Sequence, residues 1–395
     1  MGGRAIDTVR AGIGRAQLLL LGGIAALGSL ATQIIVPALP LVAQGLVISA
    51  ADGQLIITVY LVGLALGQLV GAPLADRYGR RPVILGGLTV FAAGTLACGA
   101  AGSLAVMLAG RAVQSLGAAT ALVTARAMAT DRAPKGSAAA PLALMSSVTL
   151  ISPTVAPTIG GALTSIGGWQ APFWLLLALS IAAIALAPLL GETRPGDRLP
   201  IGPARLARTY FQVVRKGRYL PLALSNALIT GGMYVYLAVS PFLLRAAGAS
   251  PAQAGLYYSV VASAMIAGTL AVPRVMARWP GRLGSIGAAA LGSGAVLVMA
   301  VAATGGNLVA LLAAMMLIAF GSGMTGPALM AQALERQRDN ASAAISLFGM
   351  TQMGGAALFS TATVRLVPSP SLKLALIGVL VLLALALRRY ASRGS

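Results

Sequence analysis

The sequence lacks histidine and contains a single cysteine, Cys98, among its 395 residues. Structural zinc sites, iron–sulfur clusters and histidine-based catalytic triads each need several such side chains, so the composition excludes them. One cysteine cannot form a disulfide within the chain. We expect neither a metal nor another cofactor. The sequence also shows no pair of acids or nucleophile–base pair, and so does not predict an enzyme.

Charged residues are scarce as well. They make up 9% of the chain, against about a quarter in soluble domains, while 58% of the residues are hydrophobic and the mean hydropathy is +0.88. The formal charge of +20 comes from 28 Lys and Arg against 8 Asp and Glu. Because the basic residues are scattered between apolar runs and form no stripe, we expect a lipid bilayer as partner and no nucleic acid.

Long apolar runs dominate the rest of the chain. A membrane helix needs about 20 mostly apolar residues to cross the hydrocarbon core. This length predicts twelve spans, and hence an all-helical integral membrane fold. The predicted spans are 16–38, 54–75, 82–101, 104–125, 138–165, 170–190, 219–244, 252–273, 283–304, 307–333, 342–364 and 370–387.

The basic residues alternate between the two sides of these spans. If the N-terminus is cytoplasmic, 24 of the 28 Lys and Arg lie in cytoplasmic segments, which is the distribution that positive residues follow in membrane proteins. Arg245, Arg365 and Lys373 lie on the other side, and Arg111 lies within a span. The sequence therefore predicts a multi-pass protein with both termini in the cytoplasm.

The longest polar connection divides the spans into two equal sets. We predict an N-terminal six-helix bundle over 1–190, a cytoplasmic linker over 191–218 and a C-terminal six-helix bundle over 219–395. Two matched bundles are typical of transporters built from repeats, with the substrate site near the midplane between them. A channel is disfavoured, because no charged ring or filter sequence is present.

The second and third predicted spans are joined by GAPLADRYGRRP, residues 71–82. Asp76 can accept charge-assisted hydrogen bonds at a helix end, and Gly79 permits a tight reversal. The segment resembles the signature loop of the major facilitator superfamily, which implies a conformational latch. The latch residues would be Asp76, Arg77, Gly79, Arg80 and Arg81.

Further segments narrow this resemblance. They are VPALPLVAQGL at 36–46, GRAVQSLGAATALVTARAMATD at 110–131, SPTVAPTIGGAL at 152–163 and GWQAPFW at 168–174. Together they resemble the Bcr/CflA branch of drug:proton antiporters, which is associated with bicyclomycin- and chloramphenicol-type efflux and antibiotic resistance. The resemblance implies a monomer in the bacterial inner membrane that exports a small organic molecule in exchange for protons.

The fifth predicted span combines helix-kinking and small residues. Pro153 and Pro157 each remove a backbone hydrogen bond, while Gly160 and Gly161 allow close helix contact. Kinked, closely packed helices can rock against one another, so we interpret these four residues as a gating segment. Ordinary helix packing remains the alternative.

Arg111 is the one basic residue predicted deep in a span. A charge there is costly, so it should face a wet cavity or a partner; Gln114 lies three residues on, on the same helix face. The resemblance implies that such an arginine takes part in substrate and proton coupling. With the other polar and aromatic residues of the pore-facing spans, it forms our predicted substrate site. The predicted site comprises Gln33, Tyr60, Arg111, Gln114, Asn226, Tyr234 and Gln352.

The resembled antiporters place an acid near the end of their first helix, where this sequence has Gln33. Glutamine cannot titrate, which leaves three alternatives. A proton could bind an edge residue such as Asp52 or Glu335; an anionic or zwitterionic cargo could carry its own charge past Arg111; or the protein could be an uncoupled or symport-type carrier for metabolite uptake or exchange.

Overall fold

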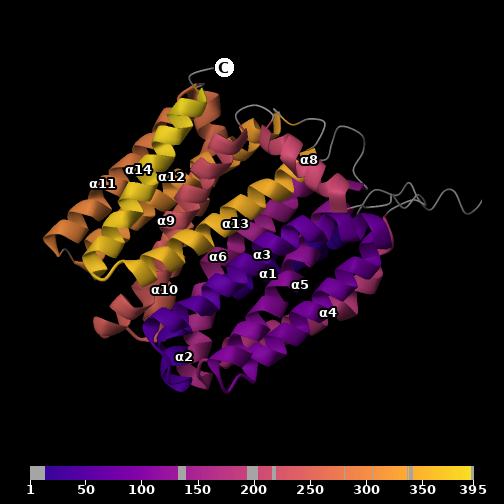
Figure 1. Ribbon diagram of the computed structural model, residues 1–395, viewed down its shortest axis with the longest axis horizontal. Coiled ribbons are helices and arrows are strands. Elements are labelled where there is room, and N and C mark those ends of the chain that lie inside the picture. Colours follow the sequence, from indigo (N-terminus) through magenta and orange to yellow (C-terminus); the bar gives the residue numbers. More distant parts are fainter. Residues whose placement is uncertain are drawn as a thin grey trace, which may run out of the picture.

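The computed structural model describes residues 14–131, 139–193, 203–215, 219–279, 281–305, 307–335, 337 and 341–392. For 139–144, 146–147, 203–206, 341–342 and 392, the backbone alone is described. Within this part of the chain every regular element is a helix (Figure 1). The described structure is therefore all-helical, as the sequence predicts.

The helices fall into two sets that follow the chain, coloured indigo to magenta and salmon pink to yellow in Figure 1. The N-terminal set contains α1 Arg15–Gln33, η2 Val36–Ala38, α2 Leu39–Gly45, α3 Ala50–Tyr78, α4 Arg80–Gly99, α5 Leu104–Asp131, α6 Ala139–Gly167, α7 Ala171–Leu186 and η3 Ala187–Leu190. The C-terminal set contains α9 Tyr219–Ala246, α10 Pro251–Arg278, α11 Leu283–Thr304, α12 Leu308–Glu335, α13 Ala341–Leu366 and α14 Pro370–Ser392.

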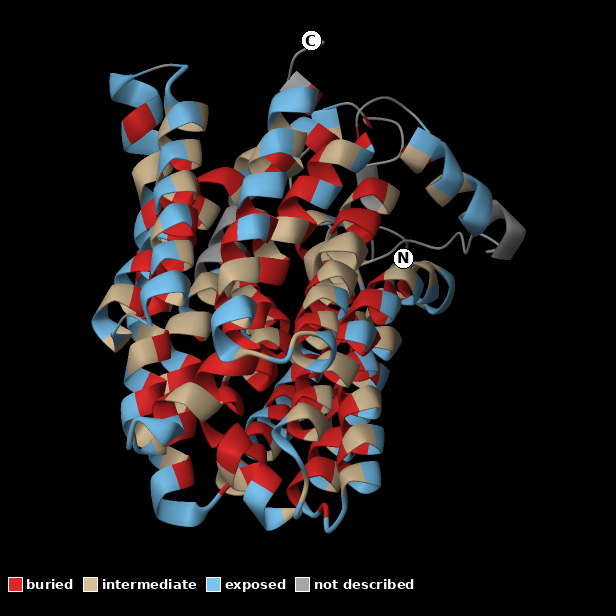
Figure 2. Ribbon diagram, turned by 60° about the vertical axis from the view of Figure 1, so that its left-hand side comes forward, coloured by how far each residue is buried: buried red, intermediate tan, exposed pale blue. Residues whose placement is uncertain are grey.

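The membrane spans agree with the predicted number. Among the described residues, eleven helices are long and apolar enough to cross a bilayer, counting Arg15–Gly45 as one element. The twelfth long helix is α6, which has 29 residues and lies over the predicted fifth span. Figure 2 shows buried residues along the inner faces of the helices and exposed ones on the outer faces. The fold is thus twelve transmembrane helices in two six-helix bundles.

The first span differs from the prediction. We predicted its end at residue 38, but helical structure continues to Gly45 through the short elements η2 and α2. Pro37 lies at the start of η2 and Pro40 at the start of α2. Proline has no N–H to donate but fits the first turn of a helix, so the chain breaks its α-helical ladder here and then resumes it.

The predicted linker contains a helix that the sequence analysis did not assign, α8 Pro203–Arg215. Tyr210 of α8 donates from Oη to the Leu69 carbonyl of α3, 3.1 Å away, and is also hydrogen-bonded to Ser346 of α13. Burial raises the pKa of Tyr210. The helix therefore contacts both halves, and we call the end of the molecule that carries it the linker end.

Close packing against α4 fixes the position of α5, the helix that carries Arg111. A Cβ on Gly94 of α4 would lie 2.7 Å from the Gly110 carbonyl oxygen, and one on Gly117 of α5 would lie 2.9 Å from the Cα of Phe91. Such separations are too short for a side chain. Glycine at both positions lets the two backbones touch, so α5 is held rigidly against α4.

Candidate functional site

Arg111 lies in the interior of α5 and is fully buried, with 0% of its surface exposed. Its Nε donates to the Ile56 carbonyl of α3 at 3.2 Å, and its Nη1 donates to the Ala31 carbonyl of α1 at 3.1 Å. Nη1 also donates to Gln114 Oε1 at 2.8 Å, whereas Nη2 is buried without a partner. The guanidinium thus joins three helices of the N-terminal half through neutral acceptors.

Tyr60 and Gln114 complete this buried cluster. The Arg111 guanidinium lies 4.0 Å from the centroid of the Tyr60 ring, a favourable cation–π geometry. Tyr60 Oη donates to the Gly28 carbonyl at 3.0 Å, and Gln114 Nε2 donates to Thr95 Oγ1 at 2.8 Å. The structure therefore brings together three of the residues predicted from the sequence and adds Thr95, a residue that sequence reasoning missed.

The geometry answers one question that the sequence left open. The sequence predicts that Arg111 faces either a wet cavity or a partner. In the described structure its Nε and Nη1 have hydrogen-bond acceptors in the protein, whereas Nη2 has none. No carboxylate pairs with Arg111 among the described residues. A buried cation held by carbonyl and amide oxygens and by an aromatic face positions helices more readily than it meets cargo, because binding cargo would break these bonds.

The predicted site residues of the C-terminal half lie on α9 and α13. Asn226 and Tyr234 are buried in α9. Each lies four residues from Thr230, so the three residues share one helix face. Gln352 Nε2 of α13 donates to Thr230 Oγ1 at 3.2 Å. Tyr234 is near enough to Arg111 to interact electrostatically with it across the two halves.

Gln33 ends α1 and is partly exposed. It is not part of the Arg111 hydrogen-bond cluster. Its role in substrate binding, like the roles of the other predicted site residues, remains a prediction.

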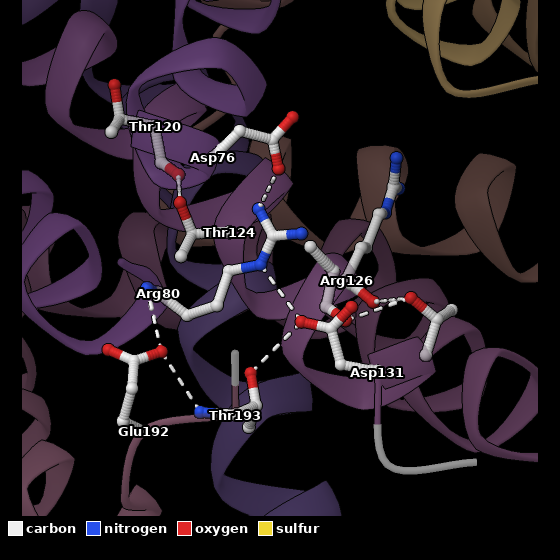
Figure 3. A network of polar contacts seen from close by, with 10 residues as sticks. Asp76, Arg80, Thr120, Thr124, Arg126, Asp131, Glu192 and Thr193 are labelled. Atoms are coloured by element: carbon white, nitrogen blue, oxygen red, sulfur yellow. Dashed lines mark hydrogen bonds and ion pairs between the residues drawn. The ribbon is translucent and has the colours of Figure 1, made fainter. Parts of the chain in front are cut away.

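Arg80 is the centre of an ionic network at the linker end (Figure 3). Its Nη1 lies 2.7 Å from Asp76 Oδ1, and its Nε lies 2.9 Å from Asp131 Oδ2 at the end of α5. Thr193 Oγ1 donates to the same Asp131 oxygen at 3.0 Å. The predicted latch residues Asp76 and Arg80 are therefore linked to α5 and to the chain that leaves η3.

Glu192 caps the start of α4 in the same network. Its two carboxylate oxygens accept the backbone N–H groups of Arg80 and Arg81 at 3.0 and 3.1 Å. Gly79 adopts φ +97°, and a Cβ there would lie 2.8 Å from Glu192 Oε2. An acid at a helix N-terminus is stabilising. Because Gly79 has no Cβ, the Glu192 carboxylate can approach the start of α4. Arg77 points elsewhere, with its guanidinium 5.2 Å from the Tyr78 ring centroid.

Sequence reasoning missed Asp131, Glu192 and Thr193. Asp131 closes the fourth-span segment that resembles the Bcr/CflA branch, and Glu192 directly follows the sixth predicted span. Both positions were visible as acids at helix ends. Their pairing with Arg80 was not, since 51 and 112 residues separate them from it.

The predicted gating residues lie in α6, where it packs against η2 and α10. A Cβ on Gly160 would collide with the Ile34 carbonyl, and one on Gly161 with the Pro251 carbonyl of α10. Pro153 and Pro157 lie inside α6, and the Pro157 carbonyl faces Gly255 of α10. The segment thus forms a backbone-to-backbone contact between the two halves. A gating role for it remains a prediction.

This contact predicts the effect of filling it. Gly161→Leu would place Cβ against the Pro251 carbonyl and 3.1 Å from the Cα of Ala252, so α6 and α10 must separate at this end. Overpacking of this kind costs about 1–3 kcal/mol. We expect faster labelling of a cysteine introduced at Thr58, which the open form would expose, and reduced transport. Gly23→Leu, where nothing lies within 4 Å of a Cβ, should change neither.

Polar side chains also join the halves at the end opposite α8. Each pair has one member in the N-terminal half and one in the C-terminal half, and such partly exposed bonds can break and re-form at small cost. The pairs are Arg245 Nη2 to Gln44 Oε1 at 3.0 Å, Arg365 Nη2 to Asp52 Oδ1 at 3.6 Å, Thr58 Oγ1 to Thr361 Oγ1 at 2.7 Å and Thr158 Oγ1 to Ser259 Oγ at 2.6 Å.

Comparison with solved structures identifies the fold. A crystal structure of the peptide transporter POT in complex with alafosfalin superposes with a TM-score of 0.79 at 15% identity, covering 98% of each chain. The xylose transporter XylE from E. coli superposes with a TM-score of 0.73 at 14% identity, covering 95% of this chain and 98% of that one. At these identities the likeness concerns the fold alone.

Sequence comparison identifies the family. The chain is 30% identical over 264 residues to an uncharacterized MFS-type transporter, YdgK of Bacillus subtilis, covering 66% of each. It is 34% identical over 181 residues to multidrug resistance protein D of Escherichia coli, covering 46% of each. The chain thus spans 66% or less of the length of these relatives. The model of the Major Facilitator Superfamily matches residues 21–360, and this chain is a member of that superfamily.

Proposed function

We propose that this protein exports a small organic molecule, drug-like or metabolic, across the bacterial inner membrane by alternating access. The observation that carries the proposal is the contact between the two bundles at the end opposite α8. It consists of partly exposed hydrogen bonds and one ion pair between side chains, together with close glycine contacts. Such a joint lets the bundles rock around a shared site. Relatives named multidrug resistance proteins support outward transport.

The distribution of basic residues gives the proposed orientation. With both termini and the linker in the cytoplasm, as 24 of the 28 Lys and Arg favour, the linker end is cytoplasmic. The joined end then faces the periplasm.

Counterflow tests the proposal. Purified protein in liposomes loaded with one unlabelled compound should accumulate the labelled compound from outside, with saturation, for at least one member of a drug, nucleoside and metabolite panel. A thermal-shift screen selects the panel, because a ligand stabilises the folded state by mass action. The proposal fails if no compound gives saturable counterflow.

A second candidate is an uncoupled or symport-type carrier for uptake or exchange, and the positions of the acids favour it. Asp52 lies in the first turn of α3, Asp76 near its last turn, and Asp131 and Glu335 each end a helix. Glu192 follows η3. None of these five described acids lies in the middle of a span; Asp7, Asp197 and Asp339 lie outside the described residues.

The pH profile distinguishes the candidates. Histidine is absent, and no described Asp or Glu lies in the middle of a span, so none of these side chains is placed there to carry a proton. We expect counterflow rates to vary less than about threefold between pH 6 and 8. A steep profile with measurable proton counterflow, abolished by Asp52→Asn or Glu335→Gln, would instead establish proton-coupled export.

A further inference from the structure

Gln54 carries a buried amide without a hydrogen-bond partner at the end opposite α8. It lies in the second turn of α3, and its surface is 1% exposed. Both polar atoms of the side chain, Nε2 and Oε1, are buried and have no partner among the described residues. Such an amide has lost its bonds to water and gained none in the protein, so it destabilises any conformation that buries it.

Gln54 lies where the N-terminal half meets α13 of the C-terminal half. One turn further along α3, the Thr58 hydroxyl is hydrogen-bonded to the Thr361 hydroxyl of α13 at 2.7 Å. Near the start of α3, Asp52 pairs with Arg365 of α13 at 3.6 Å. With 3.6 residues per turn, Gln54 and Thr58 share one face of the helix. Gln54 is therefore placed between two contacts that join the halves, on the face of α3 that meets α13.

A second glutamine on this face of α3 does have a partner. Gln68 lies about four turns further along the helix, and a Cβ on Gly349 of α13 would collide with its Oε1. Gln68 is 6% exposed, but its Nε2 donates to the Leu64 carbonyl at 3.2 Å. Burial against α13 is thus compatible with a bonded amide, and the missing partners are particular to Gln54.

We propose that Gln54 destabilises the conformation in which the halves are joined at this end, here called the joined form, and thereby sets how often the halves separate. The inference rests on the transport function proposed above, in which the two bundles rock about their contact. When α3 and α13 move apart at this end, water can bond both amide atoms, so separation relieves the penalty of burial. The side-chain pairs close the joint, and Gln54 keeps it from staying closed.

Gln54→Met tests this role, because methionine has a similar length and needs no hydrogen bond. Spin labels on cysteines introduced at Gly102 and Thr304 report the distance between the halves. Gly102 follows α4 and Thr304 ends α11, so both lie at the end opposite α8, and both are exposed. The native cysteine, Cys98, is buried. We expect the ratio of separated to joined protein to fall about tenfold in Gln54→Met, and the melting temperature to rise.

Gln68→Met is the matched control, because it removes from the same helix face an amide that already has a partner. It should increase neither the joined fraction nor the melting temperature. An unchanged ratio in Gln54→Met overturns the inference, and so does a wild type that shows the joined form alone. A higher melting temperature with an unchanged ratio also contradicts it, because the amide would then destabilise both forms equally.

The distance measurement needs no substrate, which separates this inference from the transport function. Slower counterflow in Gln54→Met, together with the lower ratio, supports both. Saturable counterflow in the wild type with an unchanged ratio in Gln54→Met refutes the role of Gln54 and leaves transport standing. A lack of counterflow for every compound in the wild type refutes transport itself, whatever the ratio does.

Discussion

Arg111→Ala is expected to abolish counterflow and to lower the stability of the protein. The substitution removes a fully buried side chain and leaves a cavity, which costs about 2–5 kcal/mol for large-to-small changes. It also removes the partner of Gln114 Oε1 and the bonds to α1 and α3. Thermal unfolding of the purified protein and counterflow in liposomes measure the two effects.

Arg111→Met separates the structural role of Arg111 from its role in transport. Methionine fills most of the volume without a buried charge, and replacing buried ionic groups by apolar ones is often neutral for stability. We expect a melting temperature near that of the wild type with transport still lost. Methionine cannot donate the hydrogen bonds by which Arg111 joins α5 to α1 and α3. Arg111→Lys should be impaired too, since an ammonium lacks the planar fork. Normal transport by Arg111→Met would remove Arg111 from the mechanism.

Arg80→Gln is expected to reduce transport strongly and to destabilise the linker end of the N-terminal half. Arg80 is the shared partner of Asp76 and Asp131, and its side chain is 11% exposed against 43% and 27% for theirs. Because solvent screens the two carboxylates, the expected loss is about 1–2 kcal/mol rather than that of a buried pair. Thermal unfolding and counterflow report the loss.

A double-mutant cycle shows whether the network acts as a unit. If Arg80 and Asp131 are coupled, Asp131→Asn should add little to Arg80→Gln. Arg77→Gln removes the same charge from the same loop but interrupts only the contact with Tyr78, so its effect should be smaller. Equal effects of Arg77→Gln and Arg80→Gln would indicate that the loop acts through its net charge and not through the ionic network.

Several features of the fold could be predicted because they depend on local sequence. Apolar runs of about 20 residues give the membrane helices wherever they pack, so all twelve long helices follow from composition and length. Gly79 between Asp76 and Arg80 predicts a reversal with an acid at one helix end and a base at the next, and the structure has both. The predicted end of the first span was wrong, because prolines at the start of η2 and α2 allow the helical structure to resume after a break.

The partners of the site residues could not be predicted in the same way. Arg111 was expected to meet either water or protein, and the choice depends on how α1, α3 and α5 pack around it. Asp131 and Glu192 were visible as acids, yet only folding brings them to Arg80.

The sequence by itself determined that this protein is embedded in a membrane, how many long apolar helices it has and where the tight turn at Gly79 lies, because hydrophobic length and turn chemistry act within one segment. Tertiary structure alone decided that Arg111 is sealed among three helices, how the ionic network closes around Arg80 and which polar pairs join the halves at the end opposite α8. These features are contacts between helices far apart in the chain, and their energies depend on geometry that no single segment contains.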